Sequence, residues 1–183
     1  MENETSMIHL RLCDKEWPFT YTTHERQIVR AIVVDGEGDF YFVRIVRNDD
    51  FGNGAFIETS GGGVEAGEEL CAAIHRELRE ELGATVEILC KLGVVEDSYN
   101  LIHRRNINHY YLCRALSFGE RQLTEDEIGH FHLSILKLSY EDAVREYNAC
   151  TDKKLGRLLA NRELPILHHA KAVLDQYKKQ VSP

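Results

Sequence analysis

The sequence lacks any pair of closely spaced cysteines. Its cysteines are odd in number and spread widely along the chain, at Cys13, Cys71, Cys90, Cys113 and Cys150. Without a C-x-x-C pair or an even framework, neither a structural zinc site nor a set of stabilising disulfides is indicated. Reduced thiols in a cytosol fit this pattern best, so we expect a cytoplasmic protein.

Long apolar runs and an excess of positive charge are also lacking. No stretch approaches the roughly 20 apolar residues that span a membrane, and the start Met-Glu-Asn-Glu does not resemble a signal peptide. The 22 Lys and Arg residues against 30 Asp and Glu residues give a net charge of −8, which disfavours non-specific binding to nucleic acid or to an anionic membrane. We therefore expect neither partner, and a polyanionic substrate needs local cations. The sequence allows a homodimer without requiring one.

Internal repeats, low-complexity segments and linkers are absent too, which favours one α/β domain over residues 1–183, with an N-terminal strand extension and a C-terminal helix. Alternating apolar patterns predict the strands Ile28–Val34 and Phe40–Val46, joined as a hairpin, and then Phe56–Thr59, Thr85–Glu96, Ile107–Phe118 and His130–Leu138. Helical patterns predict Glu68–Leu82 ending at Gly83, a helix capped by Ser139 that runs to Ala149, and Leu164–Lys179 with Pro165 near its start.

The first of these helices gathers carboxylates on one face. At 100° per residue, Glu77, Glu80 and Glu81 share an arc of about 100°. This face borders an apolar stripe formed by Cys71, Ile74, Leu78 and Leu82. Carboxylates at the edge of a packed face are partly desolvated, so they repel one another strongly, and a hard divalent cation such as Mg²⁺ or Mn²⁺ relieves that repulsion. The alternative is a solvated surface helix with i,i+4 ion pairs.

The segment around this helix follows one long pattern. Gly62 is followed by five residues and Glu68, then by seven residues, Arg76-Glu77-Leu78, one residue, Glu80-Glu81, one residue, and Gly83-Ala84. This spacing resembles the Nudix box, G-x5-E-x7-R-E-U-x-E-E-x-G-U with U apolar, and every fixed position is met. The resemblance implies a Nudix-type α/β/α sandwich around a mixed β-sheet. It also implies that Mg²⁺ or Mn²⁺ is bound by Glu77, Glu80, Glu81 and the backbone carbonyl of Gly61. The residues it implies to be structural are Gly62, Glu68, Arg76 and Gly83.

By the same resemblance, the activity is Mg²⁺-dependent hydrolysis of the diphosphate linkage of a nucleoside diphosphate derivative, by metal-activated water. The partner is then a small nucleotide substrate. The catalytic residues are Glu77, Glu80 and Glu81 together with a general base, which is either one of these box glutamates or an acid on a later loop. Glu127 is the first loop candidate, ahead of Glu125 and Glu120 in the segment "GERQLTEDEIG". Each loop acid can equally be a solvated residue with no catalytic role.

Clues to the substrate lie outside the box. Glu58 is similar to the lead-in of ADP-ribose and nucleotide-sugar pyrophosphatases, although Ser60 stands where that lead-in has proline. Arg104 and Arg105 can supply cations to phosphate, unless their segment is an ordinary turn between strands. We expect ADP-ribose or a nucleotide sugar ahead of a nucleoside triphosphate or a dinucleoside polyphosphate. The intact box glutamates argue against a non-catalytic, nucleotide-sensing domain.

Overall fold

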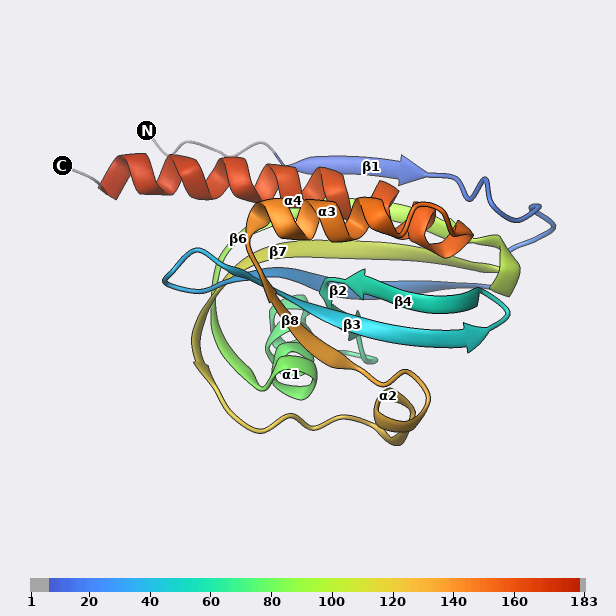
Figure 1. The fold of residues 1–183 in the computed structure, drawn as a ribbon, viewed down its shortest axis with the longest axis horizontal. Coiled ribbons are helices and arrows are strands. Elements are labelled where there is room, and N and C mark those ends of the chain that lie inside the picture. The colour runs from blue at the N-terminus through green and yellow to red at the C-terminus, as the bar shows by residue number, and fades with distance from the viewer. Residues whose placement is uncertain (1–6, 182–183) are drawn as a thin grey trace.

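The computed structural model describes residues 7–181, and Figure 1 shows how strands and helices follow one another along the chain. The strands are β1 (Ile8–Leu12), β2 (His24–Val34), β3 (Phe40–Asp49), β4 (Gly52–Glu58), β5 (Ser60–Gly63), β6 (Ala84–Tyr99), β7 (Arg104–Phe118) and β8 (Ser134–Leu138). The helices are α1 (Leu70–Leu82), α2 (Glu125–Gly129), α3 (Tyr140–Ala149) and α4 (Lys154–Val181), and a 3₁₀ turn covers Asn100–Ile102. None of the helices in this range has an apolar stretch long enough to cross a membrane.

The strands of the described range form one mixed sheet of eight. Six of them follow the order β1-β6-β7-β2-β3-β4, while β5 pairs with β2 and β8 pairs with β3. β1 runs parallel to β6 and β2 runs parallel to β7, and the other pairs are antiparallel. The mixed β-sheet expected from the sequence is confirmed.

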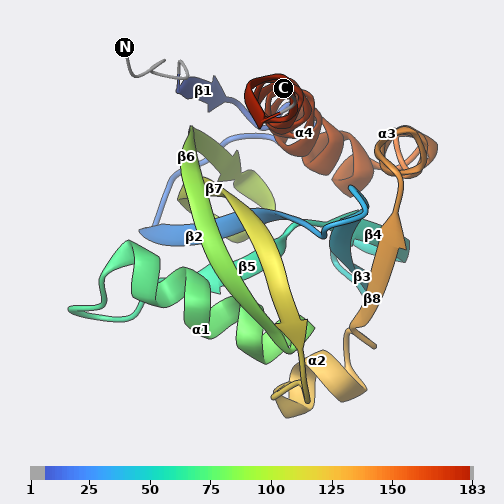
Figure 2. The same ribbon diagram turned by 90° about the vertical axis from the view of Figure 1, so that its left-hand side faces the viewer.

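Helices cover both faces of this sheet (Figures 1 and 2). The core on the α1 side is formed by apolar side chains that include Val29, Ala31, Val33, Ala73, Ile74, Leu78 and Leu82. The core on the α3 and α4 side is formed by others that include Ile32, Val34, Ala143, Tyr147, Ile166, Leu167 and Ala170. Because successive side chains of a strand point to opposite faces, β2 supplies both cores. The predicted α/β/α sandwich is confirmed.

The sheet opens between β2 and β3. These strands pair through only two residues each, next to their connecting turn, and farther along β2 pairs with β5 instead. β4 ends on the β3 side and β5 begins on the β2 side, so the chain crosses the opening at Thr59. The crossing is held by Arg30 Nη1, which donates to the Thr59 carbonyl at 3.2 Å, and by Thr59 Oγ1, which donates to Glu163 Oε2 at 2.9 Å.

Three local predictions are confirmed by the backbone. β2 and β3 form the expected hairpin. α1 ends at Gly83, whose φ of 66° is a left-handed conformation that glycine adopts readily. The Ser139 hydroxyl caps α3 by accepting a hydrogen bond from the backbone N–H of Asp142 at 3.1 Å. Each of these features depends on residue types within a few positions of one another, so the sequence alone predicts it.

The strand predicted from His130 is wrong at its start. Glu125–Gly129 instead forms α2, whose N-terminus is capped by a capping box between Thr124 and Glu127. After α2, His132 has a positive φ of 45°, which is not a strand conformation. β8 therefore begins only at Ser134. The predicted apolar stripe of α1 also needs correction, because Cys71 in the first turn of the helix is exposed.

The last helix begins at Lys154, well before the predicted Leu164, and Pro165 lies in its interior. Proline lacks the N–H that would bond the carbonyl four residues earlier. That carbonyl belongs to Asn161, an exposed residue whose backbone water can solvate. Leu159 before the proline and Ile166 after it are both buried in the core. Packing on both sides thus keeps the helix continuous through a residue that usually starts or ends one.

Leu78→Ala tests the packing of α1 on the sheet. Leu78 is fully buried, and truncation leaves a cavity, so we expect the free energy of unfolding to fall by about 2–5 kcal/mol. Leu116→Ala is the control, because Leu116 is 61% exposed on β7 and such surface changes usually stay within about 0.5 kcal/mol. Denaturant titration measures both values, and equal losses in the two variants would contradict the packing.

Candidate active site

Three carboxylates of α1 face the β4–β5 junction and the loop that follows β5. Glu77 and Glu81 are buried, with 8% and 7% of their surface exposed, whereas the Glu80 side chain is 35% exposed. Glu81 Oε2 accepts hydrogen bonds from Ser60 Oγ at 2.6 Å and from the Gly61 backbone N–H at 2.9 Å. The C-terminal half of α1 is therefore tied to the first residues of β5 by one buried carboxylate.

Glycines allow β5 to lie between β2 and α1. A Cβ atom at Gly61, whose φ is +144°, would collide with the Val29 carbonyl of β2. A Cβ atom at Gly62 would lie 2.5 Å from both carboxylate oxygens of Glu77. A larger residue at position 61 would push β5 away from β2, and one at position 62 would displace the Glu77 carboxylate. Gly61 therefore sets the distance from β5 to β2, and Gly62 sets the distance from β5 to Glu77.

Arg76 connects the loop, the helix and the carboxylates. Its guanidinium donates to both oxygens of Glu68 at 2.8 and 2.9 Å and to the Gly63 carbonyl at 2.9 Å. The same group donates to Glu77 at 2.7 Å and to Glu80 at 3.2 Å. Arg76 therefore holds the loop after β5 against α1 and partly neutralises two of the three clustered acids.

Burial makes the charged form of these acids unfavourable. Burial raises the pKa of Glu81 to about 8, although the hydrogen bonds from Ser60 and Gly61 oppose the shift. Burial also raises the pKa of Glu77, against the stabilising charge of Arg76. A cation close to Glu81 would reverse this penalty.

The donor atoms fit a hard divalent cation. Glu77, Glu80 and Glu81 offer only carboxylate oxygens, which Mg²⁺ and Mn²⁺ prefer, and no described residue donates to Glu81 Oε1. In the described structure the three carboxylates do not converge within 4.8 Å, since Arg76 Nη1 bonds both Glu77 and Glu80. Arg76 Nη1 therefore lies within hydrogen-bonding distance of two of the three candidate ligands.

A cavity of about 240 Å³ lies in the opening of the sheet. Its lining residues come from five strands, from α4 and from the turns and loops between elements, and they are Arg30, Arg47, Phe51, Glu58, Tyr99, Ile102, Arg104, Phe131, Leu155 and Arg162. We call it the arginine cavity. It adjoins the carboxylates through the Thr59 crossing, because Arg30 bonds the Thr59 carbonyl and Ser60 bonds Glu81. An acidic cluster and a cationic cavity thus lie on either side of two consecutive residues.

The two candidate substrate arginines, Arg104 and Arg105, lie on opposite faces of β7. Arg104 lines the arginine cavity, and its buried Nε has no hydrogen-bond partner among the described residues. Burial and the nearby Arg26 charge lower the pKa of Arg104. Arg105 points to the opposite face, as the next residue of a strand does, and its guanidinium pairs with Glu96 and, at 3.1 Å, with Glu25. The structure therefore brings Arg104 to the cavity and leaves Arg105 outside it.

Glu58 lines the same cavity but is already paired. Its Oε2 lies 3.3 Å from Arg30 Nη1 and 3.4 Å from Arg162 Nη2. Glu58 therefore holds two guanidinium groups in the wall, and a substrate would meet their remaining N–H groups.

Glu127 lies on α2, beyond the C-terminal end of α1 (Figure 2). Its Oε2 accepts hydrogen bonds from the backbone N–H and the hydroxyl of Thr124, at 2.6 and 2.9 Å. The loop before α2 is tied to α1, because the Gln122 N–H donates to the Glu80 carbonyl at 2.9 Å. Behind burial and the Glu80 charge, Glu127 is one of the charges that raise the pKa of Glu77. The carboxylate is fixed in place within electrostatic reach of the cluster.

Sequence reasoning missed a buried ionic pair on α4. Arg162 donates to the Tyr99 hydroxyl at 2.8 Å and to Asp97 at 3.2 Å, while Glu163 accepts from Thr59. Both residues are buried, at 1% and 0% exposure. Two adjacent charged residues on the buried face of a helix would have indicated such a pair. The sequence predicted the helix only from Leu164, after Arg162 and Glu163, so this indication was not available.

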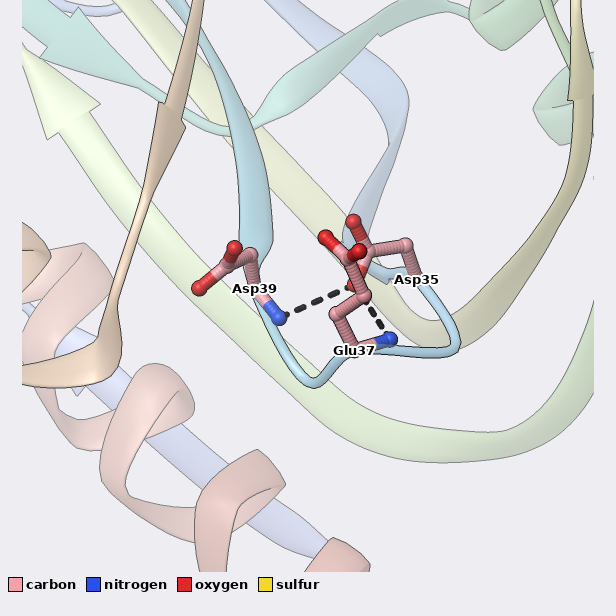
Figure 3. Close-up of side chains that lie close together, drawn as sticks. All are labelled: Asp35, Glu37 and Asp39. Carbon is pink, nitrogen blue, oxygen red and sulfur yellow. Dashed lines mark hydrogen bonds between the residues drawn. The ribbon is translucent and has the colours of Figure 1, made fainter.

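A second group of carboxylates, at the turn between β2 and β3, is neutralised from within the chain. Figure 3 shows Asp35, Glu37 and Asp39 there, with oxygens within 4.8 Å of one another. The Lys137 ammonium lies 2.9, 2.7 and 3.5 Å from them. Burial alone would raise the pKa of Asp35, but Lys137 and backbone N–H groups of the turn lower it to about 2. We assign this group no metal.

The chain matches a known domain family over most of its length. The NUDIX domain family model matches residues 24–154, which include the glycines, the carboxylates of α1 and the strands around them. No curated protein matches the chain.

Solved structures share the fold at low identity. A NUDIX hydrolase from Nitrosomonas europaea aligns with a TM-score of 0.56 and 16% identity, over 67% of this chain and 78% of that one. The E. coli ORF135 protein aligns with a TM-score of 0.54 and 25% identity, over 81% and 90%. A MutT NUDIX hydrolase from Burkholderia pseudomallei aligns with a TM-score of 0.52 and 23% identity, over 65% and 86%.

The pH dependence of stability tests the burial of Glu81. An unfolded chain releases this proton near pH 4.5, whereas the folded chain holds it to about pH 8. Stability from the neutral carboxyl is therefore fully present below pH 4.5 and is lost as the pH rises through 8. With a chelator present, we expect the melting temperature to fall between pH 5 and 8, and to fall less in Glu81→Gln.

Added Mg²⁺ should raise the melting temperature of the wild type more at pH 8 than at pH 5, because a ligand carboxyl must lose its proton to bind metal. Superimposable pH profiles of wild type and Glu81→Gln would contradict the burial of this acid.

Proposed function

This chain belongs to the Nudix family and is a Nudix-type pyrophosphohydrolase, and from that premise we propose that it uses Mg²⁺ to hydrolyse the diphosphate linkage of a nucleoside diphosphate derivative. ADP-ribose and nucleotide sugars are the favoured substrates. We place the reaction in the cytoplasm, on one domain formed by residues 1–183, with Mg²⁺ preferred over Mn²⁺ and with a homodimer as one assembly state.

The observation that carries the proposal is the position of the arginine cavity beside the acidic cluster. Arg104 has a buried Nε without a partner, and leaving a charged donor unsatisfied costs free energy unless an anion binds it. Ser60 and Thr59 connect this cavity to Glu81. A diphosphate spans such a pair of neighbouring regions, with one phosphate beside the glutamates and the other beside the guanidinium groups.

The protein's own groups then have distinct tasks. Glu77, Glu80, Glu81 and the Gly61 carbonyl hold Mg²⁺, which when bound neutralises phosphate charge and lowers the pKa of a water ligand. Arg104 binds and orients the phosphate that lies away from the cluster. Glu127 accepts the proton of the attacking water, for which its carboxylate suits it, because Thr124 holds it on α2 directly after the loop tied to α1. Arg76 and Glu68 keep the loop and the helix in register.

Glu80→Gln tests the acidic cluster. The change removes one charge and keeps the volume of the side chain, so we expect kcat to fall on the order of 10²-fold with little change in melting temperature. Glu69→Gln at the N-cap of α1 is the control, because the Glu69 side chain is exposed and makes no capping hydrogen bond. Product release is measured with Mg²⁺ on ADP-ribose, nucleotide sugars, nucleoside triphosphates and dinucleoside polyphosphates.

Near wild-type turnover of Glu80→Gln at saturating Mg²⁺ would contradict the catalytic role proposed for the acidic cluster. Turnover of nucleoside triphosphates alone would refute the substrate class but leave the cluster intact.

Arg104→Ala tests the arginine cavity, and Arg105→Ala is its matched control. A charge-assisted contact to phosphate is worth roughly 1.5–3 kcal/mol, so we expect Arg104→Ala to raise KM by about 10- to 150-fold while kcat changes little. Arg105 is paired outside the cavity, and its removal should leave both constants near wild type. Steady-state kinetics on the best substrate decides, and a KM effect confined to Arg105→Ala would reverse the assignment.

A further inference from the structure

A second cavity, of about 320 Å³, lies at the turn between β3 and β4. It shares Phe51 with the arginine cavity, so the two spaces meet at one phenyl ring. Its other side-chain walls include Trp17, Phe56, Lys153 and Lys154. We call it the turn cavity. Neither the glutamates of α1 nor the arginines discussed above line it.

Trp17 is fixed in this wall by its own chain segment. Asp14 Oδ1 accepts hydrogen bonds from the backbone N–H groups of Glu16 and Trp17, at 2.8 and 3.1 Å. The Asn100 side chain donates to the Trp17 carbonyl at 2.9 Å. The Arg157 guanidinium of α4 donates hydrogen bonds to both carboxylate oxygens of Glu16, at 2.8 and 2.6 Å. These bonds fix the backbone at Trp17, and the ring itself packs edge to face on Phe51. A ligand that contacts the indole therefore does not have to order this chain segment first.

Aromatic and cationic groups continue from the indole into the arginine cavity. The rings of Trp17 and Phe51 meet edge to face with centroids 5.5 Å apart. The Arg47 guanidinium lies 4.9 Å from the centroid of the same Phe51 ring. A molecule that fills the arginine cavity and extends past Phe51 therefore reaches the indole next.

The two lysines add hydrogen-bond donors beside the rings. Lys154 Nζ lies 5.2 Å from the centroid of the Trp17 ring, and Lys153 Nζ lies 5.9 Å from that of Phe56. Neither lysine forms a salt bridge with a residue of the described range. A lysine stem is long and flexible, so Lys154 can move from the indole face to the edge of a ring that stacks there.

We infer that the turn cavity binds the nucleobase of the substrate, stacked on Trp17 with its ring nitrogen or carbonyl acceptors bonded by Lys153 or Lys154. A base offers a π-face to an aromatic side chain and acceptors to a lysine. The inference rests on the proposed function, because the phosphates then occupy the arginine cavity and the acidic cluster. Trp17 precedes the residues 24–154 that match the family, so this wall is a specificity determinant added from outside the matched region.

The indole provides a direct test, because Trp17 is the one tryptophan of the sequence. With a chelator present to stop turnover, we expect AMP and ADP-ribose to change its fluorescence saturably, whereas ribose 5-phosphate, which lacks a base, leaves it unchanged. The double variant Lys153→Ala and Lys154→Ala should bind AMP roughly 10-fold more weakly. Lys91→Ala is the control, because Lys91 contacts His109 on the sheet, away from the cavity.

Kinetics separate this inference from the proposed function. Trp17→Ala should raise KM for the best nucleotide substrate by roughly 10-fold or more with kcat little changed, and Trp17→Phe should recover most of the loss. Hydrolysis with unchanged Trp17 emission and an unchanged KM in Trp17→Ala overturns the inference and leaves the proposed function standing. A saturable emission change without hydrolysis of any nucleotide overturns the proposed function and supports a base-binding cavity.

Discussion

Thr59 and Ser60 each donate a side-chain hydrogen bond to a buried carboxylate, and the arrangement of the candidate site depends on this pair. Thr59 bonds Glu163 of α4 at 2.9 Å, and Ser60 bonds Glu81 of α1 at 2.6 Å. The two helices lie on opposite faces of the sheet (Figure 2), so two consecutive residues join both outer layers where the chain crosses the opening. The crossing fixes the acidic cluster on one side and the arginine cavity on the other.

Such an arrangement is costly in a metal-free protein. Buried ionisable groups lose the free energy of hydration, and their ion pairs and hydrogen bonds offset this loss only when the geometry is good. On the cavity side Arg162 is balanced from within the chain, since it contacts Glu58, Asp97 and Glu163, whereas Arg104 Nε has no partner among the described residues. On the α1 side the balance is incomplete, because burial raises the pKa of Glu81 to about 8. The buried acid Glu81 favours a cation beside it, and the unbonded Nε of Arg104 favours an anion.

The parts of the fold and site that depend on neighbouring residues could be predicted from the sequence, whereas those that depend on contacts between distant residues could not. The box spacing predicted α1 and the loop before it, because glycine, carboxylate and apolar positions each carry a local constraint. The sequence offered both Arg104 and Arg105 as substrate ligands, and only their place on β7, where successive side chains point to opposite faces, separates them. α4 was predicted too short because Pro165 outweighed the core contacts of Leu159. With the start of α4 misplaced, the buried Arg162–Glu163 pair had no helix to lie on, and the crossing that it supports could not be foreseen.

The central proposal is that three glutamates of α1 bind divalent metal beside the arginine cavity, and the most direct measurement is Mn²⁺ binding without substrate. Free Mn²⁺ gives an electron paramagnetic resonance signal that diminishes on binding. The account predicts saturable binding to the wild type and to Glu69→Gln, and at least about 10-fold weaker binding to Glu77→Gln, Glu80→Gln and Glu81→Gln, since each loses one carboxylate ligand. Wild-type Mn²⁺ affinity in all three of these variants would contradict it.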